Sequence, residues 1–488
     1  MFTQPLDILL LFLISTPTVG WLLRKKDHSE LLGVYILSGL LVVAYSLYRL
    51  YQEVVKNGIV SIANQPPFNS PLGASLRVDM LSIFMAFLFV VIGCFVTAYS
   101  IRYMEDELGL IEYYTLILGM MAGMMGTVFA GDFFTLFIFW ELMCLTSYAL
   151  VAIRKQDWEP IEAGLKYLIM STAGSATILL SMSFLYGIAG TLNFAELASR
   201  LGNIPSEEWL YITLTLVIVG FGIKAAMVPF HMWLPDAHSA APSPISAILS
   251  GIMVQTGGYA LLRVLVSVFN SFQPTWQITL AIFAIFTMFG GNLMALLQDD
   301  IKRLLAYSTI AHMGYILFGF AAVSPQGVTA SLFHIMNHAI MKSLLFLSAG
   351  ALVYRTGIRD LRKLEGIRQT MPLTSIFLAV GVVAIAAIPP LNGFWSETMI
   401  ILAGVEAGML PFSLLMVINI ILSVAYYLRI IFTIVLKEPT LTSLKATEAP
   451  TSLLLPISIL AFLCIVIGFY PGPFITLAQK AAEAIPHL

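Results

Sequence analysis

Apolar residues fall into fourteen runs along this chain, and each run approaches the length of a membrane span. A helix needs about 20 apolar residues to cross ~30 Å of hydrocarbon. The loops between the runs are too short for a separate soluble domain. The pattern therefore predicts an all-α polytopic membrane protein, with residues 1–488 forming a single membrane domain. The runs lie near residues 6–23, 31–53, 79–101, 111–130, 132–153, 161–187, 209–228, 242–267, 276–297, 301–323, 328–354, 373–405 (interrupted), 412–436 and 452–473.

Composition supports the membrane class. The 488 residues are 59% hydrophobic and 11% charged, and the mean hydropathy is +0.90, whereas soluble domains average roughly 45–50% apolar and 25% charged residues. The net charge of −2 does not indicate a nucleic-acid partner. Cys94, Cys144 and Cys464 each lie alone in an apolar run, so we expect them to pack and not to bind a metal.

The placement of lysine and arginine predicts the orientation. If the N-terminus lies outside, 15 of the 25 basic residues fall in inside loops, and only Lys56, Arg77, Arg200 and Lys480 fall outside. Cytoplasmic loops carry such an excess of positive charge. We therefore expect a multi-pass protein of the cell (plasma or inner) membrane with its N-terminus outside.

Two interrupted spans each carry an embedded charge. Lys224 lies in an apolar segment, and Pro229 follows five residues later. A lone ammonium near the bilayer centre costs about 3 kcal/mol, and the backbone groups freed by a proline need protein or water as partners. A second break at Pro389-Pro390 precedes Glu397. Paired breaks of this kind predict an internal ion site and an internal repeat.

Other ionisable residues lie inside predicted spans. Glu141 lies midway along the fifth run, and Lys224 is its natural partner. His334, His338 and Lys342 recur at i, i+4 and i+8, so they share one helix face over about 12 Å. Three titratable groups in line suggest a proton relay. The alternative is that the histidines bond to neighbouring helices while the lysine reaches toward the interface.

Several further positions leave two interpretations open. His312 could extend the relay or simply pack, and Lys166 could serve the relay or extend toward the membrane surface. The charged cluster at residues 299–303 is typical of a solvated helix cap. The spacing of three further residues is not that of a familiar metal site, so no metal is expected there. These residues are His231, Asp236 and His238.

No redox cofactor site is evident. The chain has no P-loop, no Gly-rich dinucleotide motif in a βαβ unit, and no ligand set for haem, flavin or an iron–sulfur cluster. We therefore expect no cofactor, and we expect that the chain is not an enzyme on its own. Energy for ion movement would come from partner subunits.

Several motifs resemble those of a known family, the antiporter-like membrane subunits of respiratory complex I, membrane-bound hydrogenases and Mrp cation/proton antiporters, in which the similar chain is the D subunit. The resemblance covers nearly all fourteen runs. The motifs are Trp140-Glu141, Gly222-Ile-Lys224, Pro229-Phe-His-x-Trp-Leu-Pro-Asp-Ala-His238, Pro242-Ser-Pro-x-Ser-Ala247, Asp300-Ile-Lys-Arg-Leu-Leu-Ala-Tyr-Ser308 and His338-Ala-x-x-Lys-Ser-Leu-Leu-Phe-Leu347.

The resemblance implies about 14 transmembrane helices, with two inverted five-helix repeats at 111–267 and 276–436. Each repeat would contain a broken helix, and charged residues would form a hydrated axis across the membrane centre. The implied roles are a modulating ion pair of Glu141 and Lys224, a central relay lysine at Lys342, water-coordinating His334 and His338, and a terminal Glu397.

One position departs from the family pattern. Many relatives place a lysine in the eighth span where this chain has Gln255. A glutamine can order water, but it cannot carry a proton charge near neutral pH. We expect Gln255 to line a wet cavity, and together with Lys166, His312 and His238 it is a possible relay residue.

These observations predict a proton-translocating subunit of a multisubunit membrane complex. Its coupling would be to redox chemistry in partner subunits, as in an NADH-, hydrogen- or ferredoxin-linked oxidoreductase, or to Na⁺/H⁺ exchange. The expected partners are other membrane subunits of a respiratory, hydrogenase or Mrp-type complex, the lipid bilayer and H⁺ with or without Na⁺, but no nucleic acid. The alternatives are a transport-inactive membrane scaffold and a stand-alone solute transporter.

Overall fold

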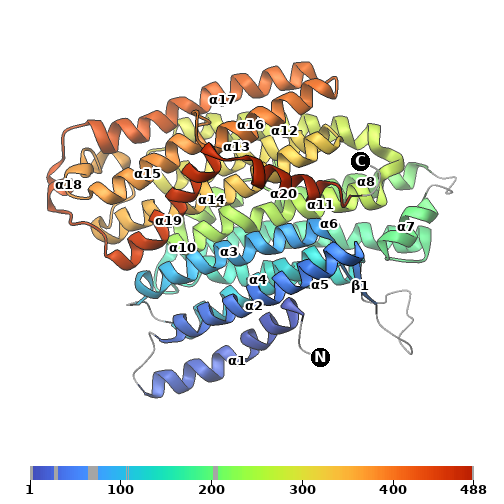
Figure 1. Cartoon of the computed structure of the whole chain (residues 1–488), viewed down its shortest axis with the longest axis horizontal. Coiled ribbons are helices and arrows are strands. Elements are labelled where there is room, and N and C mark those ends of the chain that lie inside the picture. The colour runs from blue at the N-terminus through green and yellow to red at the C-terminus, as the bar shows by residue number, and fades with distance from the viewer. Residues whose placement is uncertain are drawn as a thin grey trace.

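The chain folds into a bundle of long helices that run side by side (Figure 1). The computed structural model describes residues 4–26, 31–63, 75–105, 107, 109–201 and 207–485. The α-helices are α1 (Pro5–Lys25), α2 (Leu31–Asn57), α3 (Met80–Tyr103), α4 (Leu110–Phe129), α5 (Phe133–Val151), α6 (Trp158–Ala189), α7 (Phe194–Leu201), α8 (Glu207–Lys224), α9 (Trp233–Ala240), α10 (Ser243–Ile248), α11 (Val254–Val268), α12 (Gln273–Leu296), α13 (Ile301–Ala321), α14 (Pro325–Thr356), α15 (Pro372–Ile385), α16 (Asn392–Glu406), α17 (Leu410–Ile431), α18 (Leu441–Lys445), α19 (Thr451–Phe469) and α20 (Gly472–Ala482).

The shorter elements are two π-helical segments, three 3₁₀ turns and one β-hairpin in the described part of the chain. The π segments are η1 (Leu249–Met253) and η5 (Phe432–Leu436), and the 3₁₀ turns are η2 (Asn270–Phe272), η3 (Leu361–Lys363) and η4 (Ile367–Gln369). Strands β1 (Val60–Ala63) and β2 (Ser75–Val78) pair antiparallel, with Val60 opposite Val78. Both strands lie between the predicted runs 31–53 and 79–101, and two strands of four residues give too short a pattern to recognise in the sequence.

All fourteen predicted apolar runs fall on helices. The run 242–267 covers α10, η1 and α11, and the interrupted run 373–405 covers α15 and α16. Among the described residues, eleven helical segments are long and apolar enough to cross a membrane, and α15 is a shorter apolar helix. The multi-pass all-helical class is therefore confirmed, while the count of fourteen spans remains a prediction.

Helix ends follow local capping chemistry. A side-chain oxygen just before the first turn accepts a hydrogen bond from a backbone N–H three residues later, which satisfies one of the free donors of the helix. The capping residues are Asp79 for α3, Asp132 for α5, Asp300 for α13 and Ser324 for α14, at 2.7–3.0 Å.

Two helices are interrupted where the sequence predicted. Helix α8 ends at Lys224 and the chain resumes as α9, and helix α15 ends at Ile385 and the chain resumes as α16. In each interruption an alanine adopts a positive φ, 53° at Ala226 and 54° at Ala387. A positive φ is rare for a residue with a Cβ, and such residues gather at functional sites.

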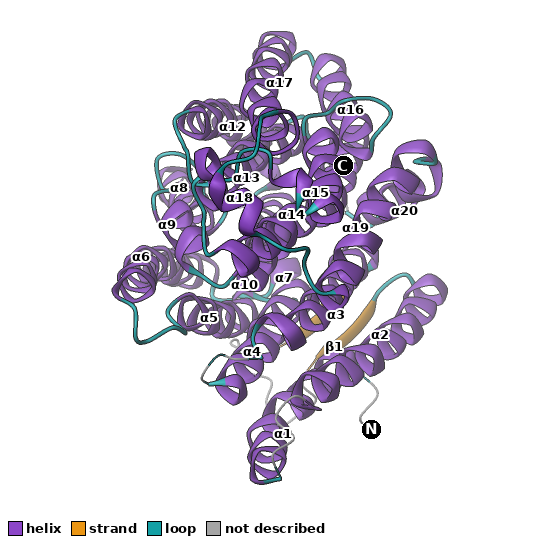
Figure 2. Ribbon diagram, turned by 90° about the vertical axis from the view of Figure 1, so that its left-hand side faces the viewer, coloured by secondary structure: helices purple, strands orange, loops and turns teal. Residues whose placement is uncertain are grey.

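The centre of the bundle is helix α14. The spanning windows of α14, of α13 and of the segment 243–268 are wholly buried, whereas those of α1 and α17 are only 22% and 33% buried. Figure 2 looks along the helices and shows α14 in the interior, with α1 and α17 near opposite edges. A polar side chain in the spanning part of α14 therefore has other helices around it and not lipid.

Ion pairs gather the charged loops at one end of the bundle. They join loops that are far apart in the sequence, so most of the basic residues predicted to lie inside share one end. The pairs include Arg154–Glu107 at 2.5 Å, Arg359–Glu159 at 2.9 Å, Arg303–Asp236 at 2.7 Å and Lys437–Glu365 at 2.6 Å.

Candidate functional site

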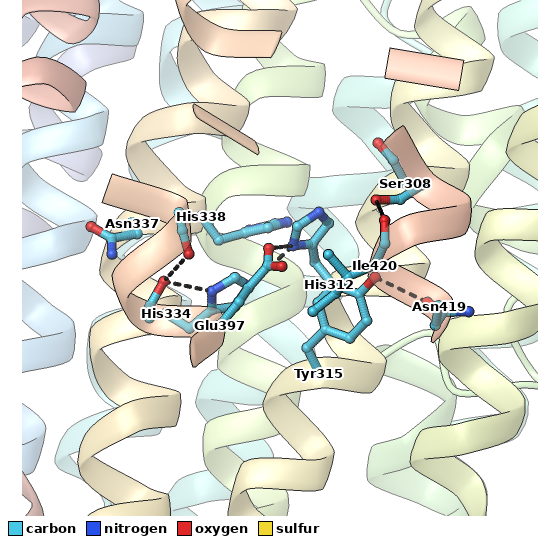
Figure 3. Close-up of polar contacts among 12 residues, drawn as sticks. Ser308, His312, Tyr315, His334, Asn337, His338, Glu397, Asn419 and Ile420 are labelled. Carbon is cyan, nitrogen blue, oxygen red and sulfur yellow. Dashed lines mark hydrogen bonds and ion pairs between the residues drawn. The ribbon is translucent and has the colours of Figure 1, made fainter. Parts of the chain in front are cut away.

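Three buried side chains from three helices meet beside the second helix break, and we call them the His–Glu cluster: His312 of α13, His334 of α14 and Glu397 of α16 (Figure 3). His312 Nδ1 lies 3.0 Å from His334 Nε2 and 3.8 Å from Glu397 Oε1. The three side chains are at most 3% exposed. His312 therefore contacts two of the other relay candidates, and its part in a relay stays a prediction.

The outer nitrogen of each histidine is held by a hydroxyl group. His334 Nδ1 lies 2.9 Å from Ser396 Oγ, and His312 Nε2 lies 3.1 Å from Tyr427 Oη. These contacts direct the remaining nitrogens toward each other and toward Glu397. Glu397 Oε1 is buried and has no hydrogen-bond partner in the described part of the chain.

Lys342 lies two turns along α14 from His334 and is fully buried. Its ammonium donates to the backbone oxygen of Leu305 at 3.0 Å and to Ser308 Oγ on α13. Both acceptors are neutral, so within the described ranges no carboxylate bonds directly to this buried cation. The alternative in which Lys342 extends toward the membrane surface is therefore wrong.

His338 joins the cluster to helix α11. The rings of His338 and His312 are 5.3 Å apart between centroids, and His338 Nδ1 lies 2.8 Å from Gln255 Nε2. His338 Nε2 and Gln255 Oε1 are buried without hydrogen-bond partners among the described residues. Polar groups of this kind normally bond to protein or ordered water, so the expectation that Gln255 lines a wet cavity stands as a prediction.

Lys224 is buried at the end of α8, where the helix breaks. Its ammonium donates to Tyr167 Oη and to Ser147 Oγ, the latter at 3.4 Å, and lies 4.5 Å from the Tyr167 ring centroid. Trp233 stacks on Tyr167 with ring centroids 4.1 Å apart, and the ammonium lies 5.8 Å from the Trp233 ring centroid. The lysine is thus held by hydroxyl groups and aromatic faces.

The expected direct ion pair between Glu141 and Lys224 is wrong for the described residues. Glu141 Oε1 is buried with no hydrogen-bond partner among them, while the ammonium of Lys224 bonds to hydroxyl groups on α5 and α6. The sequence placed both residues in the membrane interior, but the rotation of α5 and α8 about their axes decides which side chains meet.

Helix α11 packs against both halves of the site. A Cβ at Gly257 would lie 2.8 Å from Ala225 N, directly after Lys224, so α11 touches the first helix break. Two residues earlier Gln255 contacts His338. Tyr167 Oη also lies 3.6 Å from Met253 Sδ in the π segment η1. Such π turns often occur at functional sites.

Two further lysines lie in opposite environments. Lys166 has a half-exposed side chain and pairs with Glu162 at 2.9 Å and Asp236 at 3.0 Å, which favours the interpretation in which it extends toward the membrane surface. Lys302 was expected in a solvated helix cap, but it is buried and donates to the backbone oxygens of Ser239 and Ala241. Sequence spacing does not show that the chain between α9 and α10 folds over Lys302.

The remaining predicted residue is His238. It is fully buried at the end of α9, its ring stacks on Phe346 at 5.2 Å between centroids, and neither ring nitrogen has a hydrogen-bond partner in the part of the chain that the structure describes. Sequence reasoning missed the hydroxyl groups that contact these side chains, which belong to Ser308, Ser396, Tyr167 and Tyr427. Their only signal was position, since each lies in a predicted span among many other serines and tyrosines.

Fold and site together define a class of protein. A multi-pass helical bundle with two broken helices holds several acids and bases in its interior, and such groups in membrane proteins mark ion or substrate pathways. Transmembrane helices that are broken at an ion site are typical of transporters.

Comparison with known proteins places the chain within this class. A model described as "NADH:quinone oxidoreductase/Mrp antiporter, TM" matches residues 130–423, and one described as "NADH-Ubiquinone oxidoreductase (complex I), chain 5 N-terminus" matches residues 68–114. The chain therefore belongs to the membrane subunit family of NADH:quinone oxidoreductases and Mrp antiporters. It is an antiporter-like, proton-translocating subunit of the type found in multisubunit membrane complexes.

Similar proteins occur in several kinds of complex. The chain is 32% identical to the N subunit of the F(420)H(2) dehydrogenase of Methanosarcina mazei over 457 residues, covering 92% of each chain. It is 29% identical to the D subunit of the Na(+)/H(+) antiporter of Alkalihalophilus pseudofirmus over 483 residues, covering 98% and 96%. A chain of an archaeal membrane-bound sulfane sulfur reductase superposes with a TM-score of 0.89 at 29% identity, covering 99% and 96%.

Proposed function

We propose that protons cross this subunit along a buried axis that runs from Glu141 through Lys224 and Lys342 to Glu397. His334 and His338 pass protons between the last two groups. His312 is a member of the same path because it lies between His334 and Glu397. Lys166 is not, because its side chain is half exposed and paired with carboxylates.

One observation carries the proposal: the titratable groups near the second helix break lie next to one another in space. Lys342 and His338 are one helical turn apart on α14, the rings of His338 and His312 are 5.3 Å apart, and His312 contacts both His334 and Glu397. Every member is buried. Protons hop over such distances directly or through one intervening water.

The first half connects through helix α11. Lys224 bonds to Tyr167, whose hydroxyl reaches Met253 in η1, and Gln255, two residues later in α11, bonds to His338. Gln255 cannot accept a charge, so we propose that water crosses this stretch. Several buried polar atoms support this, because they have no hydrogen-bond partners among the described residues. They belong to Ser171, Ser175, Ser343, Gln255, His338 and His238.

We propose two inverted repeats at 111–267 and 276–436. The support is the likeness of the two breaks. In each, a positive-φ alanine lies three residues before a proline, Ala226 before Pro229 and Ala387 before Pro390. Each break also follows an apolar helix and lies near an embedded charge. Fourteen membrane spans complete this arrangement.

We propose that the subunit lies in the cell membrane with its N-terminus outside and the ion-paired loops inside. The redox-linked and Na⁺/H⁺-linked relatives support two sources of energy. In the first, an oxidoreductase partner drives the protons, and in the second, an opposing Na⁺ gradient drives them. The neighbouring subunits that copurify with the chain distinguish the two.

The test replaces the terminal carboxylate. Glu397→Gln keeps the size of the side chain but removes its ability to take up and release a proton, and Glu406→Gln changes an exposed glutamate at the end of the same helix. We measure proton transport with a pH-sensitive dye in proteoliposomes that contain the purified complex. We expect transport to fall about a hundredfold or more in the first variant and to stay unchanged in the second. An assembled Glu397→Gln complex that transports protons normally would overturn the proposal and favour a scaffold.

A further inference from the structure

The His–Glu cluster has the donor arrangement of a metal site. One ligand atom from each of His312, His334 and Glu397 lies within 4.8 Å of the other two, and all three residues are buried. Proton transfer needs these groups near one another, but it does not require three donor atoms to converge on one point. That convergence calls for a separate explanation.

We infer that the cluster binds one Zn²⁺ ion, which takes the place of the proton held between the two histidines and so blocks the proton path. The binding follows from the geometry of the three side chains. The block rests in addition on the proposed function. Binding replaces a proton by two Zn–N bonds and one Zn–O bond, and the displaced proton leaves to water.

The distances suit zinc. Zinc binds imidazole nitrogen at 2.0–2.1 Å and carboxylate oxygen at 2.0–2.2 Å in tetrahedral geometry, which places neighbouring donor atoms about 3.3 Å apart. The observed separations are 3.0 Å between His312 Nδ1 and His334 Nε2, and 3.8 Å between His312 Nδ1 and Glu397 Oε1. The third pair, His334 and Glu397, has its donor atoms within 4.8 Å of each other. The Glu397 carboxylate must therefore move about 1 Å toward the two histidines to complete the tetrahedral site.

The surroundings orient the ligands as they do in zinc proteins. A metal-binding histidine usually bonds through its other nitrogen to a fixed partner, which sets the tautomer. Ser396 Oγ serves His334 in this way and Tyr427 Oη serves His312. When both outer nitrogens donate, the two inner nitrogens present lone pairs to each other, and only a proton or a metal can lie between them.

The donor set also selects against the common hard cations. Mg²⁺ and Ca²⁺ take six or more oxygen ligands, whereas this cluster offers two nitrogens and one carboxylate, a set that suits Zn²⁺ and similar transition metals. Three protein ligands leave the fourth position open, unlike the four protein ligands of structural zinc sites. Burial of all three ligands predicts slow entry of the ion.

The first experiment measures zinc alone. The purified complex is dialysed to equilibrium against radioactive ⁶⁵Zn²⁺, and the wild type is compared with His312→Gln and with the matched control His231→Gln, a histidine at the first helix break. We expect the wild type and the control to bind about one zinc ion more per complex than His312→Gln. Ser396→Ala leaves every ligand in place and should weaken zinc binding roughly 10–100-fold. Equal binding by the wild type and His312→Gln would overturn the inference.

A second measurement needs no variant. X-ray absorption at the zinc edge of the wild-type complex should show two imidazole nitrogens in the first coordination sphere, and a sphere without imidazole would refute the site. Transport by the same complex should fall slowly after Zn²⁺ addition and not after Mg²⁺ addition. Zinc bound at the cluster without any loss of transport would uphold the site but contradict the proposed proton path, so the two proposals fail separately.

Discussion

Arg263 and Lys342 are both buried cations, yet the structure predicts opposite responses to their removal. Arg263 Nη2 lies 2.6 Å from Asp79 Oδ2, with side-chain exposures of 5% and 1%. Breaking a buried pair by removing one partner costs about 3–5 kcal/mol, because the other charge stays buried and uncompensated. We expect Arg263→Met to lower the free energy of unfolding by about this amount.

No charged group among the described residues is paired with Lys342, so removal of the lysine leaves no partner charge buried and uncompensated. It donates to Leu305 O and Ser308 Oγ, and Ser308 Oγ itself donates to Leu305 O at 2.9 Å. Lys342→Met therefore leaves both oxygens bonded and nearly conserves volume, and such substitutions usually cost less than about 1.5 kcal/mol. Because burying an ammonium is itself unfavourable, the variant should be about as stable as the wild type while its proton transport is lost.

Two assays on the same preparations check this contrast. Unfolding by sodium dodecyl sulfate in mixed micelles, followed by tryptophan fluorescence, gives the stability of each variant. Dye-monitored transport in proteoliposomes gives its activity. If Lys342→Met proved the less stable of the two variants, or if it transported protons like the wild type, the division into a structural ion pair and a working lysine would be refuted.

The other predictions concern single contacts. Lys166→Met removes exposed ion pairs worth at most about 1 kcal/mol and should leave transport unchanged in the proteoliposome assay. Gln255→Leu removes the 2.8 Å contact to His338 and should lower stability by about 1–3 kcal/mol, with slower transport. Gly291→Val places a Cβ that would lie 2.5 Å from Ala311 N, so α12 and α13 must move apart, and the detergent titration should show a loss of about 1–3 kcal/mol.

The glycine variant has a control elsewhere in the bundle, and each polar variant has an outcome that would contradict its prediction. Gly187→Ala adds a Cβ where no atom of the described residues lies within 4 Å, so in the last turn of α6 it should keep or raise stability by up to about 1 kcal/mol. Equal losses at Gly187 and Gly291 would show that helix contact is not the cause. For the polar variants, reduced transport in Lys166→Met would return that lysine to the proton path, and a normal rate in Gln255→Leu would remove Gln255 from it.

Several features of the protein follow from the sequence alone. The lengths of the apolar runs determine the helical segments, because a chain in hydrocarbon must satisfy its own backbone hydrogen bonds. The prolines at 229 and 390 mark the two breaks, and the spacing of His334, His338 and Lys342 places them on one face of α14. All of these depend on residues close together in the chain.

The tertiary structure decided which side chains from different helices contact one another. His312, His334 and Glu397 come from three helices, and nothing in their sequence separation indicates that their donor atoms converge. The same holds for the failure of Glu141 to pair with Lys224. The physical reason is that a side chain's partner depends on the rotation and depth of one helix against another. Close packing at small residues sets both, as where a Cβ at Gly314 would lie 2.6 Å from Met288 N on α12.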